Sequence, residues 1–334
     1  MSLEIVPDLA PEPLASQDVR TAGVAGWGAA LPSRVVTNAE VGAGADVTPE
    51  WIVKRTGITE RRHLAPGERL DALCVQAGAE AIEQAGVDAA ELDAVLVATS
   101  SADDVFPQAA PLVAGMLGAH RALNWDVGIA CTGFVAGLAQ GAALIESGRA
   151  ETVLLVGADA ISHNIDPTDR GPAALFADGA GAAVLTRGGA GRVGATVMGS
   201  DGARGDFLVA AREDRIIRMD GQEVFQHAIA RMAECSRDAL AQEGLTVEDL
   251  ALVVPHQANG RITTALAAKL ELTPEQVVDD IADRGNTSAA TIPLALHRAA
   301  AEGRIPERGH VLLTAFGAGF AWGATILHYG GDAR

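Results

Sequence analysis

The sequence predicts an α/β fold in which helices cover a largely parallel or mixed sheet. Apolar runs typical of buried strands alternate with longer helical stretches along the chain. A strand, a helix and a second strand over residues 123–159 make a βαβ unit, whose two strands are parallel. The second half of the chain repeats this order of elements, so we expect two similar halves that divide near residue 190.

In the first half, we expect strands and helices to alternate. The strands are predicted at residues 92–101, 123–128, 151–159 and 180–187. The helices are predicted at residues 71–85 and 131–147. The strand at 151–159 contains the continuous apolar run VLLVGA, which is typical of a strand that helices cover on both faces.

The second half shows the same alternation. The helices are predicted at residues 222–243 and near 261–270, and the strands at 250–256, 310–319 and 321–329. Two glycine-rich corners, at 179–181 and 317–319, are expected to mark tight backbone approaches or buried turns, because glycine has no side chain to clash there.

The start of the chain differs from the rest. It carries acids and prolines where a secretory signal would have a basic end and an apolar run. We therefore expect residues 1–20 to form a flexible N-terminal extension, with the two halves of the fold at 21–190 and 191–334. The longest apolar runs are far shorter than the ~20 residues that a membrane helix needs, so we expect no membrane association.

The composition narrows the class of protein. The formal net charge of −18 disfavours a general nucleic-acid binder, because nothing would offset repulsion from phosphates. A local basic patch for an acidic partner is compatible with this charge. The three cysteines, Cys74, Cys131 and Cys235, are widely spaced, and the sequence has no CxxC motif or Cys/His cluster. We therefore expect no metal site, no disulfide framework and a reducing cytoplasm as the setting.

Cys131 lies where a predicted strand meets a helix, in the stretch VGIACTGFVAGL. At such a position, the free N–H groups and the positive end of the helix dipole favour a thiolate. The neighbours in this stretch are small, so a substrate could approach the sulfur. The alternative is an inert small residue at a tight turn. Cys74 and Cys235 fall in helical apolar patterns and are expected to pack in the core.

Two polar residues occupy comparable positions. His256 ends the predicted strand in VVPHQANGRI, which is the usual place for a functional side chain in an α/β sheet. Asn286 lies in a glycine-flanked turn in RGNTSAATIPLAL. Each residue alone is more often structural, since asparagine commonly forms turns.

The combination of these residues carries more information than any one of them. Cys131, His256 and Asn286 can supply a nucleophile and two hydrogen-bond donors for an oxyanion. Two donors facing a thioester oxygen suit chemistry that passes through an enolate. A Cys-His-Asn protease is the rival on residue types alone, and it would use the asparagine to orient the histidine.

Nine motifs over residues 22–330 resemble, in the same order, those of the β-ketoacyl-acyl carrier protein synthase III family. They are EWIVKRTGITERR (50–62), FPQAA (106–110), DVGIACTGF (126–134), VLLVGAD (153–159), DPTDRG (166–171), FADGAGAAVL (176–185), VPHQANGRI (254–262), GNTSAATIPLAL (285–296) and FGAGFAWGA (316–324). The resemblance implies a thiolase-like five-layer αβαβα fold from two pseudo-symmetric halves. It also implies an acyltransferase that initiates fatty acid synthesis.

The resemblance implies a role for each of the three polar residues. Cys131 would accept the acyl group of a short acyl-CoA, and His256 and Asn286 would promote decarboxylation of malonyl-acyl carrier protein. The backbone N–H groups of Cys131 and Ala318 would form the oxyanion hole. The product would be 3-oxoacyl-acyl carrier protein. The resemblance implies no metal and no cofactor, because coenzyme A enters as the thioester substrate.

Further residues match positions that bind substrates or partners in the family. Trp51 and Arg170 match the pair that sandwiches the coenzyme A adenine, and Arg55 matches a phosphate contact. Arg261 matches a basic residue that receives the acidic carrier protein. Phe106 matches the residue that the partner in a homodimer inserts into the primer pocket, where a large side chain shortens that pocket.

Gly221, Phe225 and Asn259 match the lining of the pantetheine tunnel. The chain departs from the family pattern near the primer pocket, because residues 197–221 form a shorter segment than usual and Ile129 is bulkier than the usual small residue. These departures concern which acyl group is accepted. The alternative within the fold is a starter-unit ketosynthase or acyltransferase of a polyketide or other secondary-metabolite pathway.

Overall fold

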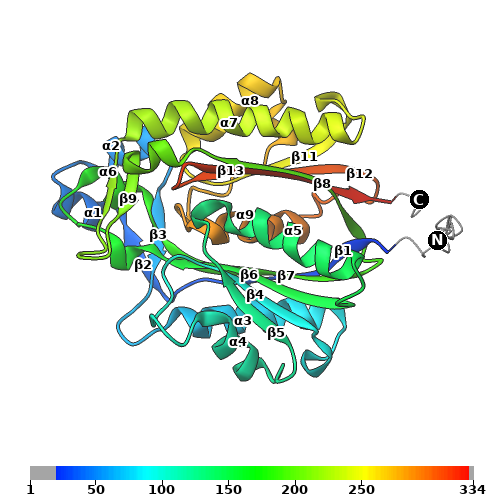
Figure 1. Ribbon diagram of the computed structural model, residues 1–334. Coiled ribbons are helices and arrows are strands. Elements are labelled where there is room, and N and C mark those ends of the chain that lie inside the picture. The colour runs from blue at the N-terminus through cyan, green and yellow to red at the C-terminus, as the bar shows by residue number, and fades with distance from the viewer. Residues whose placement is uncertain (1–19, 331–334) are drawn as a thin grey trace, which may run out of the picture.

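The structure is a computed structural model that describes residues 20–330, so residues 1–19 of the predicted extension lie outside the described part of the chain. The described residues form five layers, in which two layers of one continuous nine-stranded sheet alternate with three layers of helices (Figure 1). The outer layers are α3 (Leu70–Ala85) with α4 (Ala109–Leu117) and α7 (Gly221–Gln242) with α8 (Gly260–Leu270), and the central layer is α5 (Gly133–Glu146) with α9 (Thr291–Ala301). The predicted five-layer αβαβα architecture is confirmed.

Each of the two sheet layers comes from one half of the chain. The first contains β1 (Ala22–Ala30), β4 (Ala94–Ala98), β5 (Leu123–Val127), β6 (Thr152–Ala160) and β7 (Asp178–Arg187). The second contains β8 (Gly191–Ser200), β11 (Leu250–Pro255), β12 (Gly309–Gly317) and β13 (Ala321–Tyr329). Two residue pairs, Gly23 with Arg192 and Val24 with Gly191, join β1 to β8 and connect the layers at one edge.

The same pairing pattern occurs in both layers. In the first, β4 is parallel to β6, and β6–β7 and β7–β1 are antiparallel. In the second, β11 is parallel to β12, and β12–β13 and β13–β8 are antiparallel. The two halves are therefore built alike, as predicted, with mixed sheets. Strand β5 extends the first layer beside β4.

The remaining elements surround one end of this frame. They are β2 (Arg34–Thr37), α1 (Asn38–Ala45), α2 (Pro49–Thr56), β3 (Glu60–His63), α6 (Arg170–Leu175), β9 (Leu208–Ala210) and β10 (Ile217–Met219). The 3-10 turns are η1 (Ala89–Glu91), η2 (Ala130–Thr132), η3 (Ile161–Asn164), η4 (Gly202–Phe207), η5 (Val247–Asp249), η6 (Pro274–Gln276) and η7 (Ser288–Ala290). Within residues 20–330, no helix is both long and apolar enough to cross a membrane.

Helix α5 is apolar on nearly all sides because it lies between the two sheets. Phe134, Leu138 and Ile145 on this helix are completely buried, and each contributes roughly 1.5–3 kcal/mol through removal of apolar surface from water. Glycines allow the close packing: a Cβ added to Gly137 would lie 2.3 Å from Leu155 Cδ1. The central layer is thus a tightly packed support for the turns that precede α5 and α9.

The predicted strands and long helices are present, with shifts at their ends. The helix predicted from residue 131 begins as η2, and α5 starts at Gly133, because Ala130 has a left-handed φ of 46°. The glycines at 179–181 lie inside β7 and mark a close approach to α9, since a Cβ on Gly181 would lie 2.9 Å from Leu294 N. These glycines therefore mark a close approach between β7 and α9, and the chain does not turn there.

Candidate active site

Cys131 lies in η2, between the edge strand β5 and the central helix α5. Its side chain is buried, with 8% of the residue exposed. Gly317 at the end of β12 packs directly against it: a Cβ added there would lie 2.8 Å from Cys131 Cβ and 3.2 Å from Sγ. The absence of a side chain at Gly317 therefore allows a strand of the second half to reach the cysteine of the first half.

One cavity brings the three predicted residues together. Cys131, His256 and Asn286 all line a space of about 100 Å³, which we call the Cys–His–Asn cavity. The three residues come from η2, from the end of β11 and from the turn before η7. The other walls are mainly apolar and include Leu175, Phe176, Leu208, Met219, Phe225, Ile262 and Phe316. The predicted constellation is thus one site, formed by both halves of the chain.

A second space of about 120 Å³, which we call the apolar chamber, also has Cys131 in its wall. Aliphatic side chains of β9, β10 and η3 form much of this wall; they are Ile161, Leu208, Val209, Ala210 and Ile217. Strands β9 and β10 belong to the segment 197–221 that was predicted to shape the pocket. A small apolar space beside a nucleophilic sulfur suits a short acyl chain.

The Cys131 thiol is held by a hydroxyl and shielded from water. Ser288 Oγ donates a hydrogen bond to Cys131 Sγ at 3.4 Å. Burial raises the pKa of Cys131 to about 11, and the hydrogen bond from Ser288 acts in the opposite direction. Burial therefore outweighs the thiolate preference expected of a helix start, and the free protein holds a neutral thiol at pH 7.

His256 is buried beneath α9. Its backbone N–H donates to Thr314 O at 2.7 Å, and its Nδ1 lies 2.6 Å from Thr291 Oγ1. With Nδ1 engaged in this way, Nε2 is the ring nitrogen that can meet a substrate in the cavity. Burial lowers the pKa of His256 to about 3, so the ring is neutral at pH 7 and carries a single N–H.

Asn286 is fixed through both its backbone and its side chain. Its N–H donates to Leu175 O and its carbonyl accepts from Ala177 N–H, each at 2.9 Å. The side-chain Oδ1 accepts from Ser288 N–H at 2.9 Å, and Nδ2 donates to Ala258 O at 3.3 Å. Because an amide nitrogen carries two N–H groups, one donor remains for a substrate oxygen.

A buried carboxylate supports the turn that holds Asn286. Asp159, at the end of β6, accepts hydrogen bonds from Ser100 N–H at 2.8 Å and from Ser101 Oγ at 2.6 Å. Its other oxygen accepts from Ala289 N–H at 3.2 Å. Burial raises the pKa of Asp159, and these hydrogen bonds lower it. This carboxylate joins η7 of the second half to a strand of the first half.

Trp51, Arg55 and Arg170 form a cation–aromatic cluster. The guanidinium carbons of Arg55 and Arg170 lie 5.8 and 5.6 Å from the centre of the Trp51 ring. A flat ring between Trp51 and Arg170 needs a separation of about 7 Å, since each stacked contact takes about 3.5 Å. One of these two side chains must therefore swing outward before an adenine can enter between them.

The residues predicted for the tunnel and its rim are also close together. Gly221, Phe225 and Asn259 line the Cys–His–Asn cavity. Asn259 also caps α8, because its Oδ1 accepts from Arg261 N–H at 2.9 Å. The exposed guanidinium of Arg261 lies 5.5 Å from the centre of the Phe225 ring. This places a cation beside a wall residue of the cavity.

Phe106 and Ile129 were predicted for the primer pocket, Phe106 as the residue that a partner copy inserts. Phe106 is 83% exposed in the loop before α4, and Ile129 packs half-buried against the central core. Neither is among the residues that line the apolar chamber or the Cys–His–Asn cavity. Ala318, predicted for the oxyanion hole, does line the apolar chamber together with Cys131 and Ser288.

Sequence reasoning missed Ser288, Thr291 and Asp159. Ser288 and Thr291 lie in the same GNTSAATIPLAL motif as Asn286, and two hydroxyls at the start of a small-residue helix were the available signal. Their partners, Cys131 and His256, lie 157 and 35 positions away along the chain, so no local pattern reveals the pairs. Across residues 20–330, no three or more His, Cys, Asp or Glu side chains are grouped to hold a metal ion.

Models of known families match most of the site. The model described as 3-oxoacyl-[acyl-carrier-protein (ACP)] synthase III matches residues 125–202, and the model of the C terminal part of the same synthase matches residues 240–329. The first range includes Cys131, and the second includes His256 and Asn286.

Known relatives cover nearly the whole chain. Beta-ketoacyl-[acyl-carrier-protein] synthase III 2 of Streptomyces coelicolor is 44% identical over 311 residues, which is 92% of this chain and 94% of the relative. The crystal structure of 3-oxoacyl-[acyl-carrier-protein] synthase III from Aquifex aeolicus has a TM-score of 0.90 and 40% identity, covering 92% of this chain and 100% of that one. The priming β-ketosynthase of the R1128 polyketide pathway has a TM-score of 0.90 and 38% identity, covering 95% and 99%. The chain therefore belongs to the 3-oxoacyl-[acyl-carrier-protein] synthase III family and has the thiolase-like fold of its members.

Proposed function

We propose that the protein condenses a short acyl-CoA with malonyl-acyl carrier protein by a decarboxylative Claisen reaction. The product is 3-oxoacyl-acyl carrier protein, and the reaction initiates fatty acid synthesis. The observation that carries this proposal is the convergence of Cys131, His256 and Asn286 on one mainly apolar cavity. The 44% identity with the Streptomyces coelicolor synthase over 92% of the chain supports it.

In the first half-reaction, Cys131 Sγ attacks the carbonyl carbon of the acyl-CoA thioester. The bond to the coenzyme A sulfur breaks, and the thiol proton leaves with coenzyme A. The backbone N–H groups of Cys131 and Ala318 stabilise the negative oxygen of the tetrahedral intermediate; losing one such donor costs on the order of 10²–10³ in rate. The acyl group then occupies the apolar chamber beside Sγ.

In the second half-reaction, malonyl-acyl carrier protein loses carbon dioxide and becomes an enolate. His256 Nε2–H and an Asn286 Nδ2–H donate to the thioester oxygen, where the negative charge develops. The enolate carbon attacks the acyl-cysteine carbonyl, and the Cys131 thiolate leaves and takes a proton from water. The apolar walls of the cavity exclude water and strengthen both hydrogen bonds.

The substrates reach Cys131 through the residues of the tunnel. Trp51 and Arg170 hold the adenine of coenzyme A, and Arg55 contacts a phosphate, while Gly221, Phe225 and Asn259 line the path of the pantetheine arm. Arg261 receives the acidic carrier protein beside this path. No metal or cofactor enters the scheme, because the thioester is already an activated acyl group. A reducing cytoplasm suits it, since the three cysteines are free and buried.

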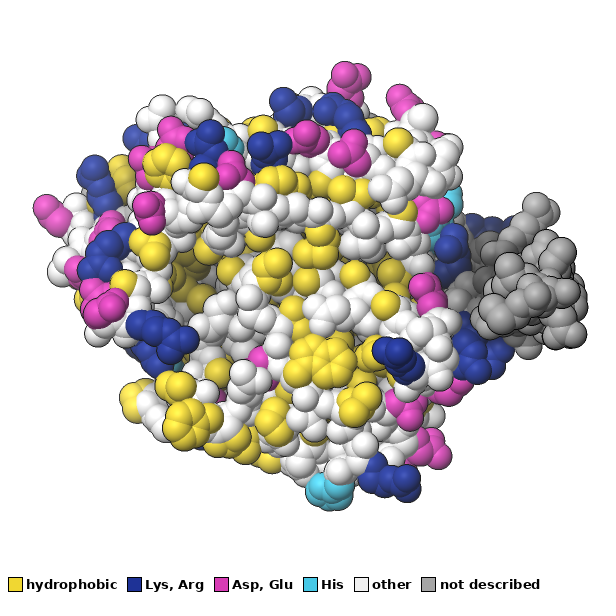
Figure 2. Space-filling model, in the orientation of Figure 1, with side chains coloured by type: hydrophobic (Ala, Val, Ile, Leu, Met, Phe, Trp, Pro, Cys, Tyr) yellow, Lys and Arg dark blue, Asp and Glu magenta, His cyan; other side chains and the backbone are white. Residues whose placement is uncertain are grey.

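A homodimer is part of the same proposal. The large hydrophobic residues Val105, Phe106, Met116 and Leu123 are exposed in the segment that contains α4 and β5. Hydrophobic side chains are visible across the lower part of the face in Figure 2, where these elements lie in Figure 1. Contact with a second copy would bury such a surface and bring Phe106 to the partner's primer pocket. Residues 21–190 and 191–334 are the proposed halves of each copy.

The test uses the purified protein with malonyl-acyl carrier protein and a panel of acetyl-, branched, medium-chain and aromatic CoA thioesters. We expect an acyl adduct on Cys131 by intact mass, release of carbon dioxide, and a 3-oxoacyl product. The Cys131→Ala variant should give no adduct. Formation of the product by Cys131→Ala at the wild-type rate would contradict the proposal.

A second candidate is a starter-unit ketosynthase or acyltransferase of a polyketide or other secondary-metabolite pathway. The similarity to the R1128 priming β-ketosynthase, with 38% identity over 95% of the chain, favours it. Transfer of the acyl group from Cys131 to another acceptor without release of carbon dioxide from malonyl-acyl carrier protein would identify the acyltransferase. Preference for an acyl-CoA outside primary metabolism would identify the starter-unit ketosynthase.

A further inference from the structure

The segment between His256 and Asn286 returns beside the strand from which it left. Val278 N–H donates to Val253 O at 2.9 Å, which fixes the returning chain against β11. The buried side chain of Gln257 then joins the two: its Nε2 donates to Pro255 O at 2.8 Å and to Val278 O at 3.1 Å, and its Oε1 accepts from Asp280 N–H at 2.8 Å. This amide uses both N–H groups and its carbonyl for that junction.

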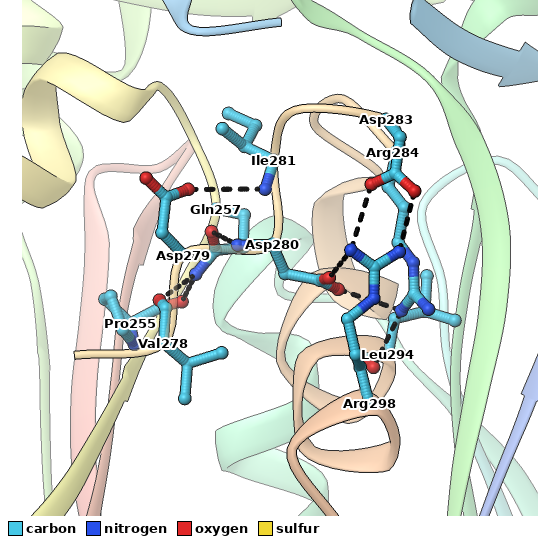
Figure 3. A network of polar contacts seen from close by, with 10 residues as sticks. All are labelled: Pro255, Gln257, Val278, Asp279, Asp280, Ile281, Asp283, Arg284, Leu294 and Arg298. Carbon is cyan, nitrogen blue, oxygen red and sulfur yellow. Dashed lines mark hydrogen bonds and ion pairs between the residues drawn. The ribbon is translucent and has the colours of Figure 1, made fainter. Parts of the chain in front are cut away.

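Four charged residues continue this junction into helix α9 (Figure 3). The Asp280 side chain, 2% exposed, accepts from Arg284 Nη1 at 2.8 Å on one oxygen and forms an ion pair with Arg298 Nη1 at 2.8 Å on the other. Arg298 also donates to both oxygens of Asp283, at 3.0 and 2.8 Å. The two carboxylates balance the two guanidiniums, so we call the four residues the ion cluster.

The ion cluster lies next to the turn that holds Asn286, both in sequence and in space. Arg284 is two positions before Asn286, and its Nη1 also donates to Leu294 O of α9 at 2.8 Å. Between them, Gly285 has a left-handed φ of 68°, and a Cβ there would lie 2.9 Å from Ala177 Cβ. The chain therefore has little freedom between the guanidinium and the asparagine.

Helix α9 connects the ion cluster with His256 as well. Thr291, the first residue of α9, contacts His256 Nδ1, and the next turns of the same helix carry Leu294 and Arg298. His256 and Asn286 are thus held by one helix and one loop, whereas Cys131 depends on β5, η2 and α5. Ser288 in η7 donates one hydrogen bond from this assembly to Cys131 Sγ.

The ion cluster is charged under ordinary conditions. Burial raises the pKa of Asp280 to about 6, with Arg284 and Arg298 acting against the rise and Asp283 and Glu302 adding to it. The carboxylate is therefore ionised at pH 7. A buried charge whose partner is removed is strongly destabilised, so loss of one guanidinium forces Asp280 and its loop to move.

We propose that the ion cluster of Asp280, Asp283, Arg284 and Arg298, joined to β11 through Gln257, positions His256 and Asn286 for decarboxylation and leaves acyl loading of Cys131 unaffected. The inference rests on the proposed function. These residues are positioning residues, since their contacts end on the loop and the helix that carry the two donors. Their effect should fall on the rate constant of the second half-reaction, because misplacing a donor by about 1 Å can cost on the order of 10²-fold.

The test separates the two half-reactions in Arg284→Met. With a preloaded acyl-enzyme, we expect kcat for condensation to fall at least about tenfold, while the KM for malonyl-acyl carrier protein and the rate of acyl loading stay within about twofold. Arg284→Lys restores a charge that can reach Asp280, and it should recover most of kcat. If Arg284 had only a structural role, Arg284→Lys would regain thermal stability, but its kcat for condensation would not recover selectively.

The matched control is Arg237→Met. Arg237 donates to Lys269 O at 2.7 Å and so joins α7 to α8, away from the ion cluster. The Arg237→Met variant should keep the rates of both half-reactions within about twofold of the wild type. If Arg284→Met does not fold, Arg298→Gln replaces it, because the Arg298 side chain is 31% exposed and its loss is milder.

Equal losses in loading and condensation would overturn the proposal, and so would an unchanged kcat in a folded cluster variant. The same selective loss in Arg237→Met would also overturn it. Failure of the proposed function would look different, because the wild-type protein itself would then give no condensation product.

Discussion

At the scale of single residues, one hydroxyl proton decides which tautomer of His256 faces the cavity. Thr291 Oγ1 lies 2.6 Å from His256 Nδ1 and 3.1 Å from Ser288 O. A hydroxyl carries one proton, so Thr291 can donate to only one of these atoms. The donor role proposed for His256 needs the proton on Nε2, and Thr291 must then donate to Nδ1.

The Thr291→Val variant tests this arrangement. Without the hydroxyl, nothing at this position selects the tautomer with Nε2 protonated, so we expect condensation to slow by on the order of tenfold or more. Acyl loading of Cys131 should stay within about twofold. Thr291→Ser keeps the hydroxyl and should condense at nearly the wild-type rate. Single-turnover product formation from preloaded enzyme measures the rate of condensation in both variants. Condensation by Thr291→Val at the wild-type rate would contradict the assignment.

Sequence reasoning singled out the three residues that the structure brings to one cavity, but not the residues that hold them. Cys131, His256 and Asn286 stand at the ends of recognisable strands or turns, so local patterns mark them. Ser288 and Thr291 act through contacts made only when distant elements fold together. The primer-pocket role of Ile129 stays a prediction: its position near Cys131 in sequence does not determine which side its side chain faces, and it packs against the central core.

At the scale of elements, the end of β12 and the η2 turn fit together through Gly317. A Cβ at this position would lie 2.8 Å from Cys131 Cβ, which is closer than real Cβ contacts come. In Gly317→Ala, either β12 or η2 must shift, and we expect acyl loading to slow by on the order of 10²-fold. Intact-mass detection of the acyl adduct over time measures this rate.

Gly115→Ala is the matched control for that variant. Gly115 lies in α4, and a Cβ added there meets nothing within 4 Å. Its loading rate should equal that of the wild type. An unchanged loading rate in Gly317→Ala would show that the two elements do not depend on this contact.

The long elements were predictable because their patterns are long. Periodic or continuous apolar runs marked the strands of both sheets and helices such as α3 and α7. The strands β9 and β10 have three residues each, which is too short for an alternating pattern, yet they wall the apolar chamber. The 3-10 start before α5 depends on the left-handed backbone of Ala130, which composition does not show.

At the scale of the whole molecule, the buried neutral His256 makes the fold sensitive to acid. Burial lowers its pKa from the usual 6.5 to about 3 in the folded protein. Between these values the unfolded chain binds the proton more readily, so stability is full above about pH 6.5 and falls as the pH is lowered. Asp280, with its pKa raised from 3.8 to about 6, acts in the opposite direction over that range.

The His256→Asn variant isolates the histidine contribution. We expect the difference in unfolding free energy between pH 7 and pH 4 to shrink by about 3 kcal/mol relative to the wild type. Chemical denaturation at the two pH values measures it, and His120→Asn, at an exposed position, serves as the control. An unchanged pH dependence in His256→Asn would mean that acid sensitivity arises elsewhere.

Docking of a second protein also belongs to the scale of the whole molecule. The protein has a net charge of −18, so an acidic carrier protein, as proposed, would need a local cation in order to dock. We expect Arg261→Glu to raise the KM for malonyl-acyl carrier protein by about tenfold or more and to leave the acyl-CoA half-reaction unchanged. Steady-state kinetics of each half-reaction checks this; equal losses in both would argue against a docking role.

The central claim is that Cys131 carries the acyl group while His256 and Asn286 promote decarboxylation. The most direct measurement uses Asn286→Ala, followed by intact mass for the acyl-Cys131 adduct and by product analysis after addition of malonyl-acyl carrier protein. We expect the adduct to form as in the wild type and the 3-oxoacyl product to fall by on the order of 10²-fold or more. Condensation by Asn286→Ala at the wild-type rate would contradict the claim.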